Sequence, residues 1–306
     1  MKKNLKSKHI KKNILITGGN GYLGYALQEQ ISTENYNIFV LNKTKPTKKI
    51  HKIKYLQIDI SQKKDINQYQ TLFKKIDILI HLAAYVPKEQ KFDDADKSIK
   101  VNITGAINLV NLLNKKTKLI YASTCEIYTV FNDNIINENL DNKQSSFYAI
   151  SKLFTEKMLE KICQIKDVQF IALRFANIYG QKEKILKATL NFTKSAINNK
   201  ELVIFGDGQD KRSFIYIEDA VRAIIKAINY RKSNIFNISS GETITILDLA
   251  KLIIKIAKSN SKIIFKPRMN EKKDLVFDAK KAKKELKFNS IFNLAEGLKA
   301  KIDYLR

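Results

Sequence analysis

Three glycines at intervals of three residues follow a short apolar run near the start of the chain: Gly18, Gly21 and Gly24. The run, residues 13–17, predicts a buried strand, and a helix is expected from about 22 to 32. This is the local structure that binds a dinucleotide, because the glycines let the backbone approach a pyrophosphate and the helix N-terminus supplies free amide groups. The spacing is a variant of that fingerprint, and the alternative is a turn that binds nothing. In either case the N-terminal part is expected to form an α/β fold.

Five more short apolar runs repeat the strand pattern, and helical patterns separate most of them. The runs are residues 37–41, 55–59, 77–82, 118–123 and 170–174. Nearly continuous apolar strands that alternate with helices indicate a parallel sheet covered on both faces. We therefore predict an α/β fold built on a Rossmann-type, doubly wound parallel sheet.

The pattern changes after about Gly180. Residues 13–180 are predicted to form the dinucleotide-binding domain, and the mixed helices and short strands of 181–306 predict a smaller C-terminal α/β lobe over the strand ends. A strand at 214–217 and a helix at 218–229 suggest that about 214–232 returns to the first domain. Residues 1–12 predict a flexible basic tail.

The charge balance bears on the class of partner. Lys and Arg number 56 against 30 Asp and Glu, a formal charge of +26 over 306 residues. The lysines are spread along the whole chain, which indicates a biased composition more than one basic surface, so no nucleic-acid partner is expected. No apolar run is long enough to span a membrane, and no membrane partner is expected. Because Cys125 and Cys163 make no disulfide framework, the natural setting is a reduced cytoplasm.

The end of the second strand selects the cofactor. An acid there would bind a ribose 2′-hydroxyl, and a basic residue would accept a 2′-phosphate. Asn42 stands at this point, followed by Lys43 and by Lys45. These residues favour NAD and leave NADP open. Asp59, at the end of the third strand, could accept a hydrogen bond from the adenine amino group, or it could be a turn or capping residue.

Tyr148 and Lys152 are four residues apart in a segment expected to be helical, so their side chains share one face. An ammonium group beside a phenol favours the phenolate and lowers its pKa. Tyr148 is therefore a candidate general base. The alternative is a solvated pair of the kind that any Lys-rich protein contains.

With these motifs in order, the chain resembles the extended short-chain dehydrogenase/reductase family, in its branch of NAD-dependent nucleotide-sugar epimerases and dehydratases. Further segments that carry the resemblance are 81–84, 101–105, 174–180 and 206–219. It implies a Rossmann-type fold, NAD, a nucleotide-diphosphate sugar as substrate and no metal. It also implies a homodimer formed through a four-helix bundle of the helices near 98–113 and 148–161.

The resemblance assigns a set of cofactor residues and a set of catalytic residues. The cofactor residues are Gly18, Gly21, Tyr22, Leu23, Asn42, Asp59, Ile60, Leu82, Ala83, Ala84, Tyr148 and Lys152. The catalytic residues are Thr124, Tyr148 and Lys152. In this scheme Tyr148 removes a proton from a sugar hydroxyl while the adjacent carbon passes a hydride to the nicotinamide, and Thr124 hydrogen-bonds the reacting oxygen.

Glu126 is a fourth candidate catalytic residue. The run Thr124-Cys-Glu-Ile-Tyr128 resembles the Thr-x-Glu-x-Tyr pattern of 4,6-dehydratases and UDP-glucuronate decarboxylases, in which the glutamate of the dehydratases takes the C5 proton. Cys125, however, stands where the glucose-type dehydratases carry the aspartic acid that protonates the leaving hydroxyl. The mannose-type dehydratases carry Ser at this position, which Cys resembles more closely. Glu126 could equally be a surface carboxylate, since a 4-epimerase needs no base beyond Tyr and Thr.

The resemblance also assigns four substrate residues: Asn102, Asn177, Arg212 and Arg268. Arginine suits bidentate binding of a diphosphate. Each of the four has an alternative role as a surface or capping residue.

These features together predict NAD-dependent oxidation at C4 of a nucleotide-linked sugar, followed by 4-epimerisation or 4,6-dehydration. Alternatives are a 4-dehydrogenase that releases the keto sugar and a reductase of 4-keto sugars, because all of these enzymes use the same Thr, Tyr and Lys. A cofactor-sensing protein without turnover and a basic nucleic-acid binder are rivals of another class.

Overall fold

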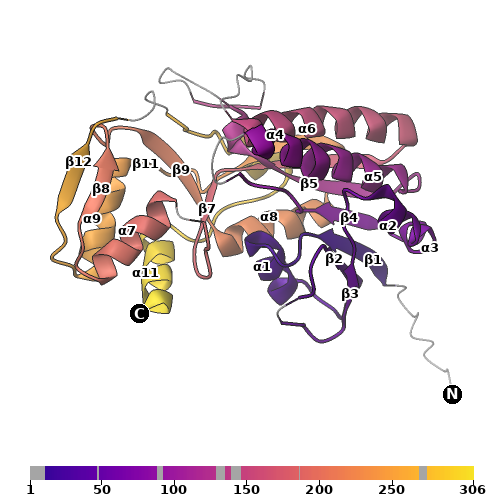
Figure 1. Ribbon diagram of the computed structural model, residues 1–306, viewed down its shortest axis with the longest axis horizontal. Coiled ribbons are helices and arrows are strands. Elements are labelled where there is room, and N and C mark those ends of the chain that lie inside the picture. Colours follow the sequence, from indigo (N-terminus) through magenta and orange to yellow (C-terminus); the bar gives the residue numbers. More distant parts are fainter. Residues whose placement is uncertain are drawn as a thin grey trace.

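The computed structural model describes residues 11–46, 48–87, 92–128, 135–138, 146–185, 187–268 and 274–306. Most of the predicted basic tail, residues 1–12, lies outside this part of the chain. Figure 1 shows a larger lobe, built around one sheet, and a smaller lobe that contains the C-terminus.

The larger lobe contains a seven-stranded sheet with the order β10-β6-β5-β4-β1-β2-β3, and every pair in it is parallel. This confirms the predicted fold class. The strands are β1 (Lys12–Thr17), β2 (Tyr36–Asn42), β3 (Ile53–Gln57), β4 (Ile78–His81), β5 (Lys118–Thr124), β6 (Gln169–Phe175) and β10 (Asn234–Ile238). The order reverses between β1 and β4, which is the point where open α/β sheets bind ligands.

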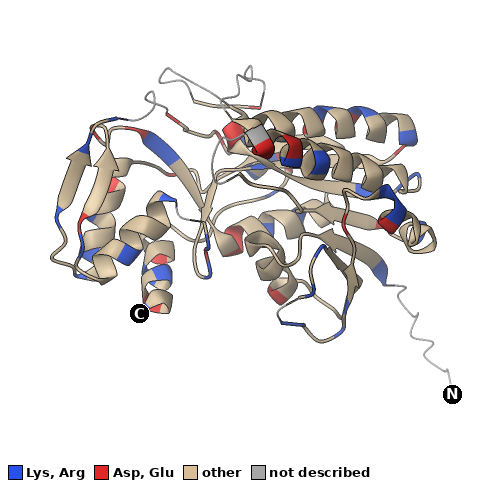
Figure 2. Cartoon of the chain, viewed as in Figure 1, with Lys and Arg blue, Asp and Glu red and all other residues tan. Residues whose placement is uncertain are grey.

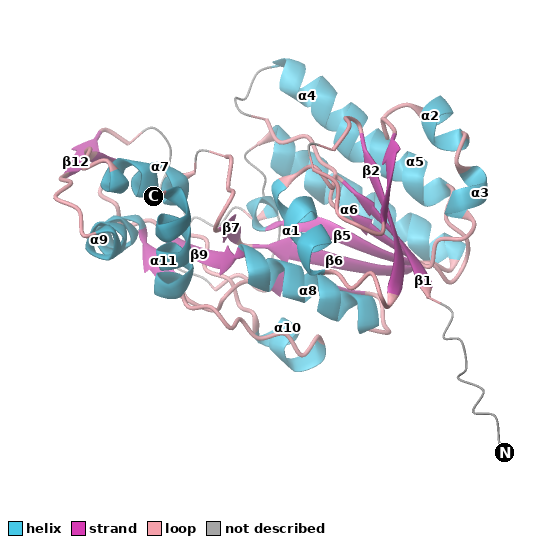
Figure 3. Cartoon of the chain, turned by 90° about the horizontal axis from the view of Figure 1, so that it is seen from below, coloured by secondary structure: helices cyan, strands magenta, loops and turns pink. Residues whose placement is uncertain are grey.

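Both faces of this sheet are buried because its strands are apolar at successive positions. Ile14 and Ile16 of β1 belong to one core cluster and Leu15 to another. Helices α1 (Tyr22–Gln30) and α8 (Ile217–Asn229) contribute to the first cluster, while α5 (Gly105–Asn111) and α6 (Phe147–Lys166) contribute to the second (Figure 3). The remaining helical elements of this lobe are α2 (Lys63–Asn67), α3 (Gln70–Phe73), α4 (Phe92–Ser98), a π-helix (Ile99–Thr104), a 3₁₀ turn (Cys125–Ile127) and α10 (Lys280–Glu285).

The smaller lobe has its own core, formed by two small sheets and three helices. The three-stranded sheet has the order β11-β9-β7, and β12 pairs with β8 in the second. Its strands are β7 (Asn177–Tyr179), β8 (Leu202–Phe205), β9 (Lys211–Tyr216), β11 (Thr243–Thr245) and β12 (Ile263–Lys266). Its helices are α7 (Ala188–Ile197), α9 (Ile246–Ala257) and α11 (Leu294–Leu305).

The chain passes between the lobes more often than the sequence indicated. The predicted strand at 214–217 is part of β9, which pairs with β7 and β11 and not with the large sheet. The helix after it, α8, does pack on the large sheet. The seventh strand, β10, was not predicted because it is short and carries Asn234 and Asn237 within its apolar run.

Lysines and arginines are spread over both lobes in the view of Figure 2, and no single helix or strand carries most of them. Within the described part of the chain, no helix is long and apolar enough to cross a membrane.

Candidate active site

A pocket of about 400 Å³ opens at the C-terminal ends of β1, β4, β5 and β6. It brings together ten of the predicted site residues: Gly18, Gly21, Tyr22, Leu23, Leu82, Ala84, Thr124, Glu126, Tyr148 and Lys152. These residues come from distant parts of the sequence, and the parallel sheet places them together because all its strands end at the same edge.

The glycine turn forms one wall of this pocket. Gly18 has φ +73°, and a Cβ atom there would lie 2.6 Å from the amide nitrogen of Ala83. A Cβ on Gly24 would lie 2.3 Å from the carbonyl oxygen of Gly18. Helix α1 begins at Gly21, and no described side chain caps its N-terminus. The turn therefore packs closely on the end of β4 and directs amide groups and the positive end of the helix dipole to one place, which fits the pyrophosphate of a dinucleotide.

The residues predicted at the adenosine end lie outside the lining of this pocket. The side-chain oxygen of Asn42 accepts a hydrogen bond from the backbone N–H of Asn20 at 2.9 Å. The side-chain nitrogen of Asn42 donates one to the side-chain oxygen of Asn20 at 3.1 Å. Asn42 thus fixes the glycine turn. Asp59 pairs with Lys43 at 2.9 Å, so this lysine neutralises a carboxylate of the neighbouring strand. Ile60 is buried beside them.

Short capping interactions hold the catalytic candidates at two element ends. Thr124 is the last residue of β5, and its hydroxyl accepts a hydrogen bond from the Glu126 amide at 3.2 Å. Ser146 caps α6 by accepting from the Ala149 amide at 3.1 Å. Tyr148 consequently lies in the first turn of α6 and Lys152 one turn later, as the four-residue spacing predicts.

The Lys152 side chain lies on a stack of aromatic rings. Its Nζ atom is 4.0 Å from the centre of the Tyr121 ring, and His81 stacks on Tyr121 with 5.8 Å between ring centres. The His81 ring is in turn hydrogen-bonded to the Thr17 hydroxyl at 2.7 Å. This column links β1, β4 and β5 to the catalytic helix through buried side chains.

The pKa of Tyr148 differs from expectation. Burial raises this pKa far above its ordinary value, and the negative charge of Glu126 adds to the effect. Burial also lowers the pKa of Lys152 to about 7, so the ammonium group is itself costly here. In the protein without cofactor, desolvation of the phenolate outweighs any attraction by a neighbouring lysine, and the effect of Lys152 on the pKa of Tyr148 stays a prediction.

Glu126 lines the pocket but is not free. Its carboxylate forms an ion pair with Lys187, which precedes α7 in the smaller lobe, with 3.1 Å between Nζ and Oε1. The pair connects the two lobes across the pocket. Cys125, in contrast, is 2% exposed and is not part of the pocket lining. Burial raises the pKa of its thiol to about 12.

A buried ion pair anchors α6 to the sheet beneath the site. Arg174 of β6 contacts Glu156 of α6 with 2.5 Å between Nη2 and Oε1, and both side chains are almost completely buried. Arg174 also donates to the Tyr128 hydroxyl, which donates to Asn237 at 3.0 Å. The network satisfies these charges within the protein and fixes the helix that carries Tyr148.

The predicted substrate residues are divided between two places. Asn102 lies in the π-helix, where its side chain accepts from the Tyr85 amide at 2.6 Å and donates to the Ser151 hydroxyl at 2.9 Å. It thus holds the segment after β4 against α6. Arg212 and Arg268 lie together in the smaller lobe, and both pair with Asp210. The distance is 3.7 Å from Arg212 Nη2 to Asp210 Oδ1 and 2.8 Å from Arg268 Nη1 to Asp210 Oδ2. Asn177 lies in β7, which pairs with the β9 strand of Arg212.

Several lining residues were not predicted. Lys187 and Ile185 belong to the segment before α7, and no local pattern distinguishes Lys187 from the many other lysines of the chain. Ser123 precedes Thr124, and its buried hydroxyl has no hydrogen-bond partner among the described residues.

A Rossmann-type sheet with a glycine turn and a Thr, Tyr and Lys set at one pocket defines a short-chain dehydrogenase/reductase. The chain belongs to the NAD dependent epimerase/dehydratase family, whose sequence model matches residues 14–239. This membership confirms the expected family, the enzyme class and NAD as the cofactor.

Relatives with three different reactions align with most of the chain. The dTDP-D-glucose 4,6-dehydratase of Dictyostelium discoideum is 32% identical over 80% of this chain and 62% of its own length. The UDP-N-acetyl-alpha-D-glucosaminuronate decarboxylase of Bacillus cytotoxicus is 28% identical over 97% of this chain and 98% of its own. The crystal structure of UDP-glucose 4-epimerase from Thermotoga maritima has a TM-score of 0.87, with 26% identity over 96% of this chain and 98% of its own.

Proposed function

We propose that this protein oxidises C4 of a nucleotide-diphosphate sugar with NAD and then returns the hydride to the opposite face, as a 4-epimerase does. The observation that carries the proposal is the meeting of Thr124, Tyr148 and Lys152 with the glycine turn at one pocket. The names of the relatives support C4 as the reacting carbon. A C4 ketone is common to epimerisation and to elimination across C5 and C6, and it turns a C6 carboxylate into a β-keto acid that can lose carbon dioxide.

The chain's own residues would handle the proton. Bound NAD supplies the acceptor for the C4 hydride, the donor for its return and a positive charge. Tyr148 takes the proton of the C4 hydroxyl, and Thr124 hydrogen-bonds the same oxygen. Lys152, one helical turn after Tyr148, holds the nicotinamide ribose and places its ammonium group in the pocket. Because burial raises the pKa of Tyr148, proton removal depends on positive charge in the filled pocket.

Epimerisation is favoured over 4,6-dehydration by Cys125. Elimination of the C6 hydroxyl needs an acid beside the leaving group, and a buried thiol outside the pocket lining cannot reach it. Glu126 supports dehydration as the second candidate, because a carboxylate in the pocket could take the C5 proton. Its ion pair with Lys187 engages an oxygen that would have to accept that proton.

The smaller lobe would hold the nucleotide. We assign residues 13–180 to the cofactor domain and 181–306 to the substrate lobe, with crossings at α8 and β10. Arg212 would bind the diphosphate, with Arg268 and Asn177 beside it. Burial lowers the pKa of Arg212, which is consistent with a side chain that awaits an anionic partner as well as Asp210.

We also propose a cytoplasmic homodimer. Helix α6 exposes a row of large apolar side chains at intervals of four residues: Ile150, Phe154 and Met158, which are 49%, 49% and 36% exposed. Ile99 of the adjoining π-helix is 53% exposed. Such a row on two neighbouring helices suits a four-helix bundle with a second copy of the chain.

The test is incubation of UDP-, dTDP- and GDP-linked sugars with the protein and NAD in D2O, followed by mass spectrometry and sugar analysis. A 4-epimerase leaves the mass unchanged and inverts C4, and Tyr148→Phe stops the conversion while NAD still binds. Loss of water with deuterium gained at carbon would replace the proposal with 4,6-dehydration. Loss of two hydrogens would replace it with net dehydrogenation.

A further inference from the structure

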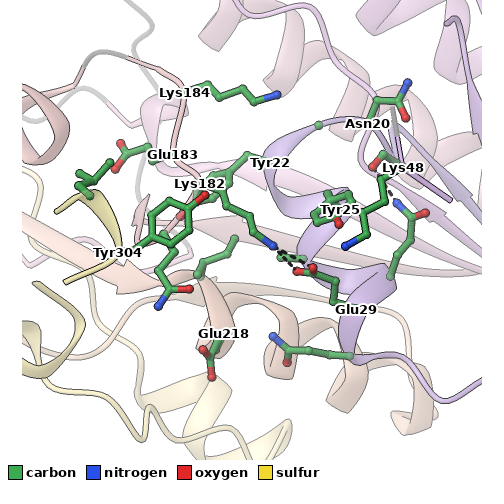
Figure 4. A pocket seen from close by; sticks show the side chains of 18 of the residues that line it. Asn20, Tyr22, Tyr25, Glu29, Lys48, Lys182, Glu183, Lys184, Glu218 and Tyr304 are labelled. Carbon is green, nitrogen blue, oxygen red and sulfur yellow. Dashed lines mark hydrogen bonds and ion pairs between the residues drawn. The ribbon is translucent and has the colours of Figure 1, made fainter. Parts of the chain in front are cut away.

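A second cavity, of about 480 Å³, adjoins the glycine turn on the side of the smaller lobe. Helix α1, the segment 181–184 and the end of α11 form its walls (Figure 4). It shares five lining residues with the active-site pocket (Asn20, Gly21, Tyr22, Glu183 and Lys184), but neither Tyr148 nor any other predicted catalytic residue lines it. Its size lies within the range of small-molecule sites.

Two of the three carboxylates of this cavity are neutralised by neighbouring lysines. Glu29 pairs with Lys182 at 2.8 Å, and dashed lines in Figure 4 mark this contact. Glu183 pairs with the buried Lys301, and its side chain is only 3% exposed. These two acids therefore offer little negative charge to a ligand.

Three further lysines of the lining, Lys48, Lys184 and Lys194, form no ion pair with any described residue. Glu218 is the carboxylate that remains opposite them. The lining thus carries an excess of positive charge in a concave surface, where low-dielectric walls strengthen the attraction for an anion.

Two tyrosine rings add a flat apolar surface. Tyr304 is 50% exposed at the end of α11, although it is a large aromatic side chain. Tyr25 lies under the Lys182 ammonium, with 4.8 Å from Nζ to the ring centre. Figure 4 shows the lysine side chain extending between the two rings. An exposed ring next to unpaired ammonium groups suits a ligand that has both a planar ring and a phosphate.

We propose that this cavity binds a second ligand, a nucleoside phosphate, whose base stacks on Tyr304 and whose phosphate meets Lys194 and Lys48. The ligand would contact Asn20 and Gly21 at the start of α1. Because the same residues line the dinucleotide pocket, occupancy of the cavity changes the affinity for NAD, and NAD changes the affinity of the cavity by the same factor.

The test is calorimetric titration of the NAD-saturated Arg212→Ala protein with UMP and AMP. The Arg212→Ala substitution removes binding at the substrate site from the measurement. One nucleotide binds per chain, and Tyr304→Leu or Lys194→Gln weakens it by about tenfold. Lys299→Gln, an exposed lysine of α11 outside the lining, leaves the affinity unchanged.

Three results would overturn the proposal. The NAD-saturated protein could bind neither nucleotide. Tyr304→Leu and Lys194→Gln could both leave the affinity unchanged. Inorganic phosphate could bind as tightly as UMP, which would leave an anion site without recognition of the ring. Both residues are exposed, and a retained melting temperature shows that each variant is folded.

Discussion

The ammonium group of Lys152 lies 4.0 Å from the centre of the Tyr121 ring, in a site where burial lowers the lysine pKa to about 7. The ring face attracts the buried ammonium group electrostatically and so replaces part of the hydration that the group loses on burial. The charge state of Lys152 in the protein without cofactor therefore depends on a strand residue that does not line the pocket.

NAD affinity should fall as the pH rises through about 7, because Lys152 then loses the positive charge that attracts the anionic dinucleotide. His81 does not interfere, since burial lowers its pKa to about 3 and it stays neutral. The measurement is the NAD dissociation constant between about pH 6 and pH 8 at constant ionic strength. Lys152→Met should flatten the profile, and a profile equally steep in that variant would contradict the assignment.

Tyr121→Leu should move this profile to lower pH. Loss of a desolvated cation–π contact, about 1–2 kcal/mol, corresponds to a midpoint roughly one pH unit lower. Tyr121→Phe keeps the ring and is the matched control, which should leave the midpoint in place. If both variants shift it equally, the hydroxyl and not the ring face is responsible.

Glu126→Gln should retain 4-epimerisation to within about tenfold, because hydride and proton transfer at C4 need only Tyr148 and Thr124. Lys187→Met, which removes the ion-pair partner, should also stay active. The measurement is kcat with the sugar nucleotide that the substrate panel identifies. Complete loss of turnover in Glu126→Gln with unchanged NAD binding would instead make Glu126 a catalytic base.

Gly18→Ala should lose NAD binding and about 2 kcal/mol or more of stability, because a residue with φ +73° is strained and the new Cβ meets the backbone of Ala83. Gly241→Ala is the matched control. Gly241 has φ +86°, but nothing lies within 4 Å of its Cβ position. It should therefore lose only about 1 kcal/mol, the cost of strain alone. Equal losses in urea unfolding would show that the contact with Ala83 contributes nothing.

Glu156→Gln should lower the free energy of unfolding by about 3–5 kcal/mol, because it leaves the buried Arg174 without a counter-charge. Glu160→Gln, on the same helix, removes an exposed pair with Lys157 and should cost less than about 1 kcal/mol. Chemical denaturation measures both. A small loss in Glu156→Gln would mean that Tyr128 and other neighbours compensate the arginine.

Phe154→Asp should dissociate the proposed dimer, because it places a charge in the middle of the apolar row on α6. Sedimentation velocity measures the mass of the particle. Glu160→Lys, 49% exposed in its side chain and on another face of the helix, also changes a surface charge and should leave the dimer intact. A wild-type protein that sediments as a monomer would contradict the proposal.

Local sequence patterns were sufficient for much of the fold. Strands β1, β2, β4, β5 and β6 are nearly continuous apolar runs, and the glycine turn has one local solution, so both could be predicted without tertiary information. Strand β3 begins two residues before the predicted run 55–59, because it includes Lys54 and its apolar positions after Ile53 are only partly buried. Tyr148 and Lys152 share a helix face, so their spacing placed both at the pocket. Strand β10 could not be predicted because its two asparagines are satisfied by neighbours distant in the sequence, such as Glu285 and Tyr128.

The interactions that set the chemistry of the site are long-range. Glu126 and Lys187 are 61 residues apart, and no local pattern joins them. The burial that raises the pKa of Tyr148 is likewise a property of the folded chain that no local pattern shows. Asn42 was expected to bind a ribose, but its hydrogen bonds to Asn20 depend on how the glycine turn lies against β2.

A substrate deuterated at C4 shows whether this enzyme oxidises that carbon. With UDP-glucose, or whichever sugar nucleotide the panel identifies, we expect turnover to slow through a primary kinetic isotope effect. The deuterium should remain on C4 of the product, because the same nicotinamide returns it. Turnover that shows no isotope effect at C4 but slows with deuterium at another carbon would contradict the account.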